Sequence, residues 1–150
     1  MKLAKALKVK NKLAGEIAKS KAIVGNHNSR QGKQEQVYDS AKEYQILEEK
    51  VERIAKLKAS IAVTNSPVWH LIFILPELKG LVTMLAQLNT TNGTVVQGGS
   101  WGDDSPKETE FVAAIKRGEA DILIAKLEAR IEAVQEELDR FNFTTDVVEG

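Results

Sequence analysis

The sequence contains no cysteine, two histidines and three prolines, and aromatic residues make up only 5% of its 150 residues. Without cysteine, the chain has no disulfides, thiolate metal sites or cysteine nucleophiles. The two histidines, His27 and His70, share no metal-binding spacing with a carboxylate, so we predict no zinc site. The scarcity of proline and aromatic residues favours helices over a β-sandwich or barrel.

Long apolar runs are also missing. The longest run, from Val68 to Leu75, has eight residues, whereas a membrane span needs about twenty. The first residues alternate lysines with apolar residues and lack the unbroken apolar core of a secretory signal. We therefore expect a soluble, cytoplasmic protein without a membrane span.

The familiar motifs of catalysis and phosphate binding do not occur. The sequence has no GxSxG, GxxxxGK[ST] or GxGxxG motif. Gly98-Gly99-Ser100 lacks the following lysine and helix that a phosphate-binding loop needs, so we interpret it as an ordinary loop. No residue stands out as catalytic, cofactor-binding or metal-binding, and no small-molecule substrate is evident. We predict that the chain is not an enzyme and uses no cofactor.

Charge of one sign is concentrated at each end of the chain, although the formal net charge is zero. Residues 1–33 contain nine lysines or arginines and one acid, whereas residues 102–150 contain thirteen acids and six bases. Such asymmetry often marks a nucleic-acid-binding arm, but an equal acidic counterweight favours pairing of the two segments, within a chain or between chains. The basic segment has no aromatic residue to stack on a base. We therefore expect no specific nucleic-acid binding.

Hydrophobic periodicity predicts three long helices. The first covers residues 2–24 and precedes a loop that includes His27, and the second covers residues 34–63 and ends before Pro67. In the second helix, two apolar series repeat every seven residues, which is typical of a coiled coil: Val37, Tyr44 and Val51, and Leu47, Ile54 and Ile61. The third helix, over residues 121–141, carries one regular series of this kind: Ile124, Leu127, Ile131, Val134, Leu138 and Phe141.

The middle of the chain is predicted to be less regular. Residues 68–75 suit a short buried strand or a buried extended link, and Pro76 then opens a short helix over residues 77–88. Asn92-Gly93 is a good hairpin-turn dipeptide, so residues 89–104 form either a loop or a small hairpin. The stretch from Ser105 to Glu108 matches a capping box and predicts the start of another helix.

These elements predict an all-α fold in a single domain, residues 1–150. A long antiparallel helical hairpin of residues 2–24 and 34–63 packs with the C-terminal helix, residues 121–141, into a coiled-coil-like bundle. An insertion over residues 67–104 adds the apolar segment, the short helix and the irregular or small hairpin segment.

Four short stretches near the two ends of the chain form a recognisable set: Met1 to Leu7, Asn26 with Gln31-Gly32, Ile61 to Ser66, and Leu138-Asp139 followed by Asn142 to Thr145. They resemble the septicolysin-like family of small, uncharacterised bacterial proteins of helical-hairpin type. They are similar to that family's start, to its Asn…Gln-Glu-Gly loop, to its Ile-Asn-x-Thr-Asn helix end and to the close of its last helix. The resemblance implies a helical-hairpin fold, and it carries over no functional residue.

The apolar segment suggests what the protein does. Residues 68–75 are apolar almost without alternation, so both sides of the segment need cover, and a third helix covers only one. An exposed apolar patch of this size is a liability in a monomer. We therefore predict a homo-oligomer held mainly by residues 67–88, acting as a self-assembling scaffold or protein–protein interaction module. Two alternatives stay open: nucleic-acid or anionic-surface binding through the lysine-rich N-terminal helix, and a small-molecule or enzymatic site in residues 68–104.

Overall fold

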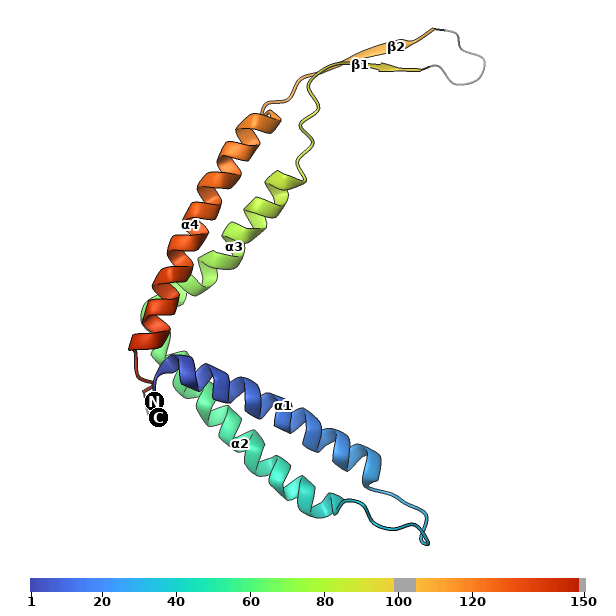
Figure 1. Ribbon diagram of the computed structural model, residues 1–150, viewed down its shortest axis with the longest axis vertical. Helices are drawn as coiled ribbons and strands as arrows, with labels where there is room; N and C mark the ends of the chain where they lie inside the picture. Colours follow the sequence, from blue (N-terminus) through green and yellow to red (C-terminus); the bar gives the residue numbers. More distant parts are fainter. Residues whose placement is uncertain (99–104, 149–150) are drawn as a thin grey trace. The chain divides into compact units, whose positions relative to one another are not determined.

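A computed structural model of the chain describes residues 1–98 and 105–148. Its elements in chain order are α1 (Leu3–His27), α2 (Ser40–Thr64), the 3₁₀ turn η1 (Ser66–Val68), α3 (Trp69–Ala86), β1 (Gly93–Gln97), β2 (Lys107–Phe111) and α4 (Arg117–Thr144) (Figure 1). The protein is predominantly helical, as predicted. It is not purely α, because β1 and β2 form a two-stranded antiparallel sheet.

The chain divides into two compact units, which are described separately. The first unit holds α1, α2, η1 and the end of α4 from Leu138 on, and the second holds residues 70–137. The long helices α3 and α4 therefore each contribute residues to both units. The prediction of one domain over residues 1–150 stays a prediction.

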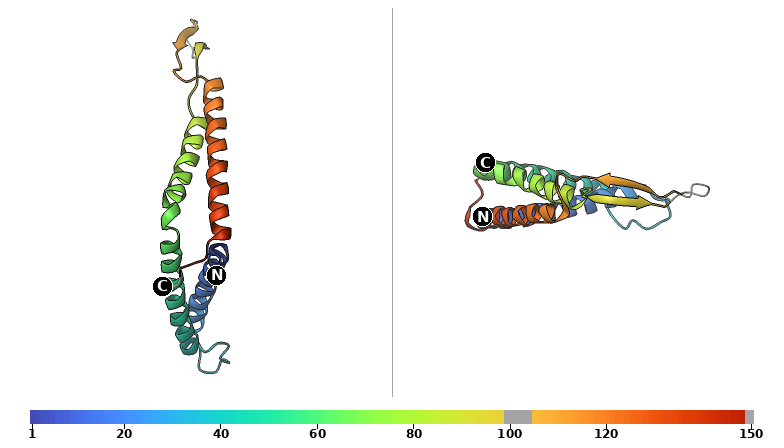
Figure 2. Two further views of the ribbon diagram at one scale, coloured as in Figure 1. Left: turned by 90° about the vertical axis from the view of Figure 1, so that its left-hand side faces the viewer. Right: turned by 90° about the horizontal axis from the view of Figure 1, so that it is seen from above.

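In the first unit, α1 and α2 lie side by side (Figure 1 and the left view of Figure 2). The buried residues of α2 recur every seven residues, at Ser40, Leu47, Ile54 and Ile61. On α1, Ala6, Leu13 and Ser20 have the same spacing. A repeat of seven returns to nearly the same side of a helix, so each helix presents one stripe of buried residues. The contact between the two helices is called the α1–α2 interface below.

Of the two apolar series predicted for α2, one is exposed within the chain. Val37, Tyr44 and Val51 are 72%, 50% and 42% exposed. Helix α2 begins later than predicted, because the Asp39 carboxylate caps it and accepts a hydrogen bond from the Lys42 backbone N–H at 3.1 Å. A second series of buried and half-buried residues lies three residues after Ser40, Leu47, Ile54 and Ile61, whereas the predicted series lies four residues after them. This second series is partly polar and consists of Glu43, Lys50, Leu57 and Thr64.

The prediction of a strand or extended link over residues 68–75 is also wrong. Helix α3 runs without a break from Trp69 to Ala86, with Pro76 inside it, instead of starting after that proline. Pro67 lies in the 3₁₀ turn η1, which leads directly into the helix. Apolar residues on almost every side hide the helical period of α3 in the sequence, although its buried residues again lie seven apart, at Leu71, Leu78 and Leu85.

The hairpin alternative for residues 89–104 is met only in part, because β1 lies in that range whereas its partner strand β2, Lys107–Phe111, lies beyond it. Gly93 pairs with Phe111 and Gln97 pairs with Lys107. The predicted turn at Asn92-Gly93 is wrong, since Gly93 has a φ of +98° and begins β1. Of the loop predicted around Gly98-Gly99-Ser100, only Gly98 belongs to the described residues.

The helix predicted from the capping box at Ser105 does not form. Lys107–Phe111 is instead strand β2, whose backbone hydrogen-bonds to β1. Helix α4 starts at Arg117, where the Glu119 carboxylate accepts a hydrogen bond from the Lys116 backbone N–H at 2.9 Å. It ends at Thr144, so it is longer at both ends than the predicted helix over residues 121–141. Similarly, His27 is the last residue of α1, not a loop residue.

Candidate interaction surface on helix α3

One side of α3 exposes four large apolar side chains. Trp69, Phe73, Leu81 and Met84 are 45%, 65%, 46% and 49% exposed. On a helix of 3.6 residues per turn these positions fall on one side, and they are called the α3 face below. The buried residues Leu71, Leu78 and Leu85 occupy a different side of the same helix. Helix α3 therefore has two apolar sides. One is buried within the chain, and the other, the α3 face, is exposed.

The same helix has the length and composition of a membrane span. Ser66–Ala86 comprises 21 residues and contains an 18-residue window with a mean hydropathy of 1.5, of whose residues 22% are buried. The predicted absence of a span considered only the eight residues before Pro76, whereas the helix continues past that proline. Length and composition alone do not distinguish a membrane helix from a helix that packs on protein. Two charged residues, Glu77 and Lys79, lie near its centre.

Within the second unit, a groove runs beside the α3 face. It has a volume of about 240 Å³ and is lined by apolar and basic side chains: Leu81, Leu85, Leu123, Lys126, Leu127 and Arg130. The Arg117 side chain joins the two helices, because its Nη2 donates to the Leu85 carbonyl at 3.1 Å. Its Nε pairs with Asp121 at 3.0 Å. The end of α3 is thus fixed to the start of α4.

A polar cluster interrupts the α1–α2 interface. Ser20 is 1% exposed, and its hydroxyl donates to Glu43 Oε1 at 2.6 Å and accepts from Lys50 Nζ at 3.0 Å. A hydrogen-bonded polar group among apolar contacts fixes the register of paired helices, because any slip leaves it without partners. Sequence reasoning missed this cluster. The available signal was the spacing of seven residues between Glu43 and Lys50 beside an apolar series.

A second feature that the sequence did not reveal joins the two ends of the chain. Lys2 forms a β-bridge with Asp146, and its Nζ donates to the Asp146 carboxylate at 2.8 Å. The Leu3 N–H donates to the Thr145 carbonyl at 2.9 Å, and the Val147 N–H donates to the Met1 carbonyl at 2.8 Å. The Lys2 ammonium holds the pKa of the Asp146 carboxyl below its ordinary value, chiefly through the hydrogen bond. These contacts, called the terminal clasp below, lie over an apolar cluster that includes Leu3, Ala6 and Ile61.

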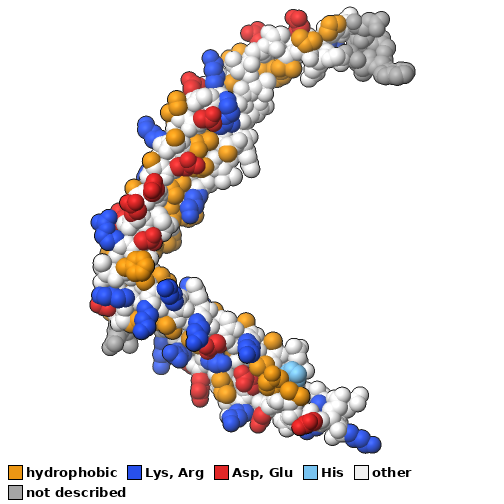
Figure 3. Space-filling model, viewed as in Figure 1, with side chains coloured by type: hydrophobic (Ala, Val, Ile, Leu, Met, Phe, Trp, Pro, Cys, Tyr) orange, Lys and Arg blue, Asp and Glu red, His pale blue; other side chains and the backbone are white. Residues whose placement is uncertain are grey.

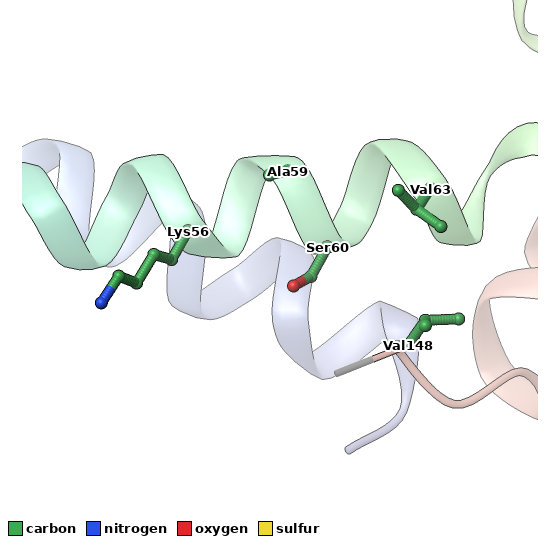
Figure 4. A pocket seen from close by; sticks show the side chains of 5 residues that line it. All are labelled: Lys56, Ala59, Ser60, Val63 and Val148. Atoms are coloured by element: carbon green, nitrogen blue, oxygen red, sulfur yellow. The ribbon is translucent and has the colours of Figure 1, made fainter. Parts of the chain in front are cut away.

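The first unit also has an open groove of about 360 Å³ beside α2 (Figure 4). Lys56, Ala59, Ser60 and Val63 of α2 line it, together with Val148 of the C-terminal tail. It contains one cation and one hydroxyl and no acid–base pair, so its lining offers no arrangement for catalysis. Within residues 1–98 and 105–148, no group of three or more His, Asp or Glu side chains is placed to hold a metal ion. The predicted lack of catalytic, cofactor and metal sites stays a prediction.

Comparison of the chain with protein-family models, with curated proteins and with solved structures finds no match. The resemblance to the septicolysin-like family stays a prediction that rests on the stretches quoted above.

Proposed function

We propose that the protein is a non-enzymatic helical module that assembles with copies of itself, and that the α3 face is its main contact surface. The observation that carries the proposal is the exposure of Trp69, Phe73, Leu81 and Met84 along one side of one helix. Contiguous apolar surface on a soluble protein marks interaction sites. Aromatic residues and methionine are enriched at such interfaces, and tryptophan is a frequent energetic hot spot.

The central charges of α3 favour a protein partner over a lipid bilayer. Glu77 and Lys79 are both exposed and lie halfway along the helix. In a membrane-spanning orientation they would enter the bilayer centre, where a lysine or acidic side chain costs about 2.5–3.5 kcal/mol on insertion scales. In a protein contact Lys79 lies on another side of the helix than the α3 face and remains in water. Glu77, four residues from both Phe73 and Leu81, lies within the face, where a hydrogen-bonding or basic group of the partner must pair with it. Leu71, Leu78 and Leu85 are in addition already buried within the chain.

A second copy is the partner that we propose, because the helices carry one common repeat. Buried residues recur every seven positions on α1, α2 and α3. Helices with this repeat pack against helices with the same repeat in coiled-coil-like bundles. A second copy of the chain carries helices with the same repeat. Closed, symmetric assemblies are the usual result of such self-contact. In this proposal the predicted coiled-coil bundle is completed between chains, in a homo-oligomer that is soluble in the cytoplasm.

Substitution of the two aromatic residues of the α3 face tests the proposal. Trp69→Ala combined with Phe73→Ala should shift the molar mass in solution toward the 16.5 kDa of one chain. Helical circular dichroism should remain, because both side chains are exposed within the chain. Light scattering coupled to size exclusion gives the mass.

The matched control is Phe143→Ala, which removes a phenylalanine that is 67% exposed at the end of α4. This variant should keep the molar mass of the parent. An unchanged mass in the double variant would show that the α3 face is not the contact. Loss of the helical signal together with the oligomer would instead assign Trp69 and Phe73 to the chain's own core.

The alternative function, binding of nucleic acid or an anionic surface, draws on the exposed lysines of α1. That helix contains six lysines, one acid and no aromatic residue. Contacts to phosphate alone give an affinity that falls steeply with salt and reads no sequence. We expect only weak oligonucleotide binding, which disappears near about 150 mM salt. A fluorescence-anisotropy titration that gives a submicromolar dissociation constant at that salt would favour the alternative over self-assembly.

A further inference from the structure

Three lysines form a regular edge along α1. Lys5, Lys12 and Lys19 lie seven residues apart and are all exposed. Each immediately precedes a buried residue of the α1–α2 interface, so the three flank that interface on one side. Lys12 reaches Glu16 of its own helix at 3.9 Å and still leaves 80% of its side chain exposed. The side-chain ammonium groups of Lys5 and Lys19 form no ion pair or hydrogen bond with any residue of the described ranges. The three residues are called the lysine edge.

Helix α4 carries a complementary series of carboxylates. Glu128, Glu132 and Glu136 follow one another in steps of four and are exposed. Their carboxylates have no ion pair or hydrogen bond among residues 1–98 and 105–148. The buried Val134 and the half-buried Ile124, Leu127 and Ile131 occupy another side of the helix. These three glutamates are called the acidic edge. In the space-filling view, blue side chains are frequent over α1 and red ones over α4 (Figure 3).

The two edges are opposite in sign, and two lysines of one span about the length of the other. With a rise of 1.5 Å per residue, neighbouring lysines of the lysine edge lie about 10.5 Å apart along the axis, and Glu128 to Glu136 spans about 12 Å. Two neighbouring lysines therefore face the whole acidic edge when the helices lie alongside each other. Both edges belong to long helices without a proline, Leu3–His27 and Arg117–Thr144, which hold the charges at fixed intervals.

We propose that the lysine edge of one copy docks on the acidic edge of a second copy. This inference rests on the proposed function and adds to it the way in which two copies recognise each other. In a two-fold symmetric pair the contact is made twice, because each copy offers both edges. Exposed ion pairs add little affinity one by one, whereas complementary fields set orientation and speed association. The α3 face supplies the affinity, and the two edges determine which surfaces of the copies meet.

Charge reversal of each edge, followed by mixing, tests the inference. One variant carries Lys5→Glu, Lys12→Glu and Lys19→Glu, and the other carries Glu128→Lys, Glu132→Lys and Glu136→Lys. Alone, each variant should have a dissociation constant at least about tenfold higher than the parent, because like charges now face each other across the contact. Mixed in equal amounts they should form a heteromer, since both contacts in that pair are attractive again. Native mass spectrometry distinguishes the heteromer from either homo-oligomer.

A matched control reverses three exposed glutamates of α2, with Glu48→Lys, Glu49→Lys and Glu52→Lys. This variant has the same change in net charge as the acidic-edge variant, and it should keep the molar mass of the parent. Its loss of assembly would show that net charge, not the edge, controls association, which overturns the inference.

The remaining outcomes separate the inference from the proposed function. If the parent is a monomer, self-assembly fails and the docking of edges fails with it. If the parent is an oligomer and both edge variants keep its mass, only the docking of edges is overturned. If both variants dissociate and their mixture stays monomeric, the edges do not pair between copies. If the lysine-edge variant keeps its mass and loses oligonucleotide binding, the lysines serve a polyanion and the inference is again overturned.

Discussion

Asp146 shows how one side chain makes the terminal clasp sensitive to pH. Its folded-state pKa is lowered from the ordinary value of 3.8, with the Lys2 hydrogen bond as the largest cause. A carboxyl with a lowered folded pKa stabilises the fold above its unfolded pKa, and this contribution is lost as the pH falls through the folded pKa. The side chain is 63% exposed, so the contribution to global stability is small. The effect should be local to the clasp.

We therefore expect Asp146→Asn to loosen the clasp at neutral pH, because the neutral amide cannot form an ion pair with the Lys2 ammonium. Hydrogen exchange of the Leu3 and Val147 N–H groups, which hydrogen-bond within the clasp, should become faster in the variant than in the parent. As the pH falls through the lowered folded pKa of Asp146, the parent carboxyl also becomes protonated, and the difference in protection should shrink. Equal protection of Leu3 in parent and variant at pH 7 would show that the ion pair contributes nothing to the clasp.

At the scale of elements, the α1–α2 interface is the contact whose loss should be most visible. Ile54 is 8% exposed within it. Ile54→Asp places an unpaired charge among apolar side chains, a change that exceeds the usual effect of a substitution. We expect a markedly lower melting temperature in thermal circular dichroism. The exposed Glu49 on the same helix is the control, and Glu49→Gln should change the free energy of unfolding by less than about 0.5 kcal/mol. An Ile54→Asp variant that melts with the parent would mean that the core lies elsewhere.

The elements also show what the sequence allows one to predict. In helices α1, α2 and α4, apolar residues recur every three or four positions between polar ones, so the sequence shows the helical period. The three predicted helices are confirmed. Helix α3 is apolar on most sides, and a continuous apolar sequence of this kind is equally compatible with a buried strand. Strand β2 has five exposed residues, Lys107–Phe111, and no apolar stripe of its own. The strand forms because its backbone pairs with β1. The capping-box pattern at Ser105 predicts a helix and contains no information about this nonlocal pairing.

The α3 face was predictable only in outline, because it too depends on contacts between distant parts of the chain. Apolar composition alone placed an interaction segment at residues 67–88. The exposure of Trp69 and Phe73 depends on which side of α3 the chain covers, and this follows only from the folded helix. The cluster around Ser20 joins residues 23 and 30 positions apart, and the bond from Lys2 to Asp146 spans 144 positions. The spacing of seven residues between Glu43 and Lys50 hints at their shared side of α2, but nothing in the sequence indicates that Ser20, or Asp146 for Lys2, is the partner.

At the scale of the whole molecule, the helices leave much apolar surface uncovered. Within the first unit, α1 packs on α2 through one stripe of residues on each helix. Large apolar side chains remain exposed on several helices, including Val63 of α2, Phe73 of α3 and Ile122 of α4. A larger bundle would bury such residues in its core. Association of copies supplies further helices, and this is the physical reason for the proposed scaffold role.

The molar mass of the parent chain in solution is the most direct test of this account. Light scattering at concentrations down to the low micromolar range should give a multiple of the 16.5 kDa chain mass, since the α3 face is then covered by a second copy. A single species at 16.5 kDa over the whole concentration range would contradict self-assembly through this face.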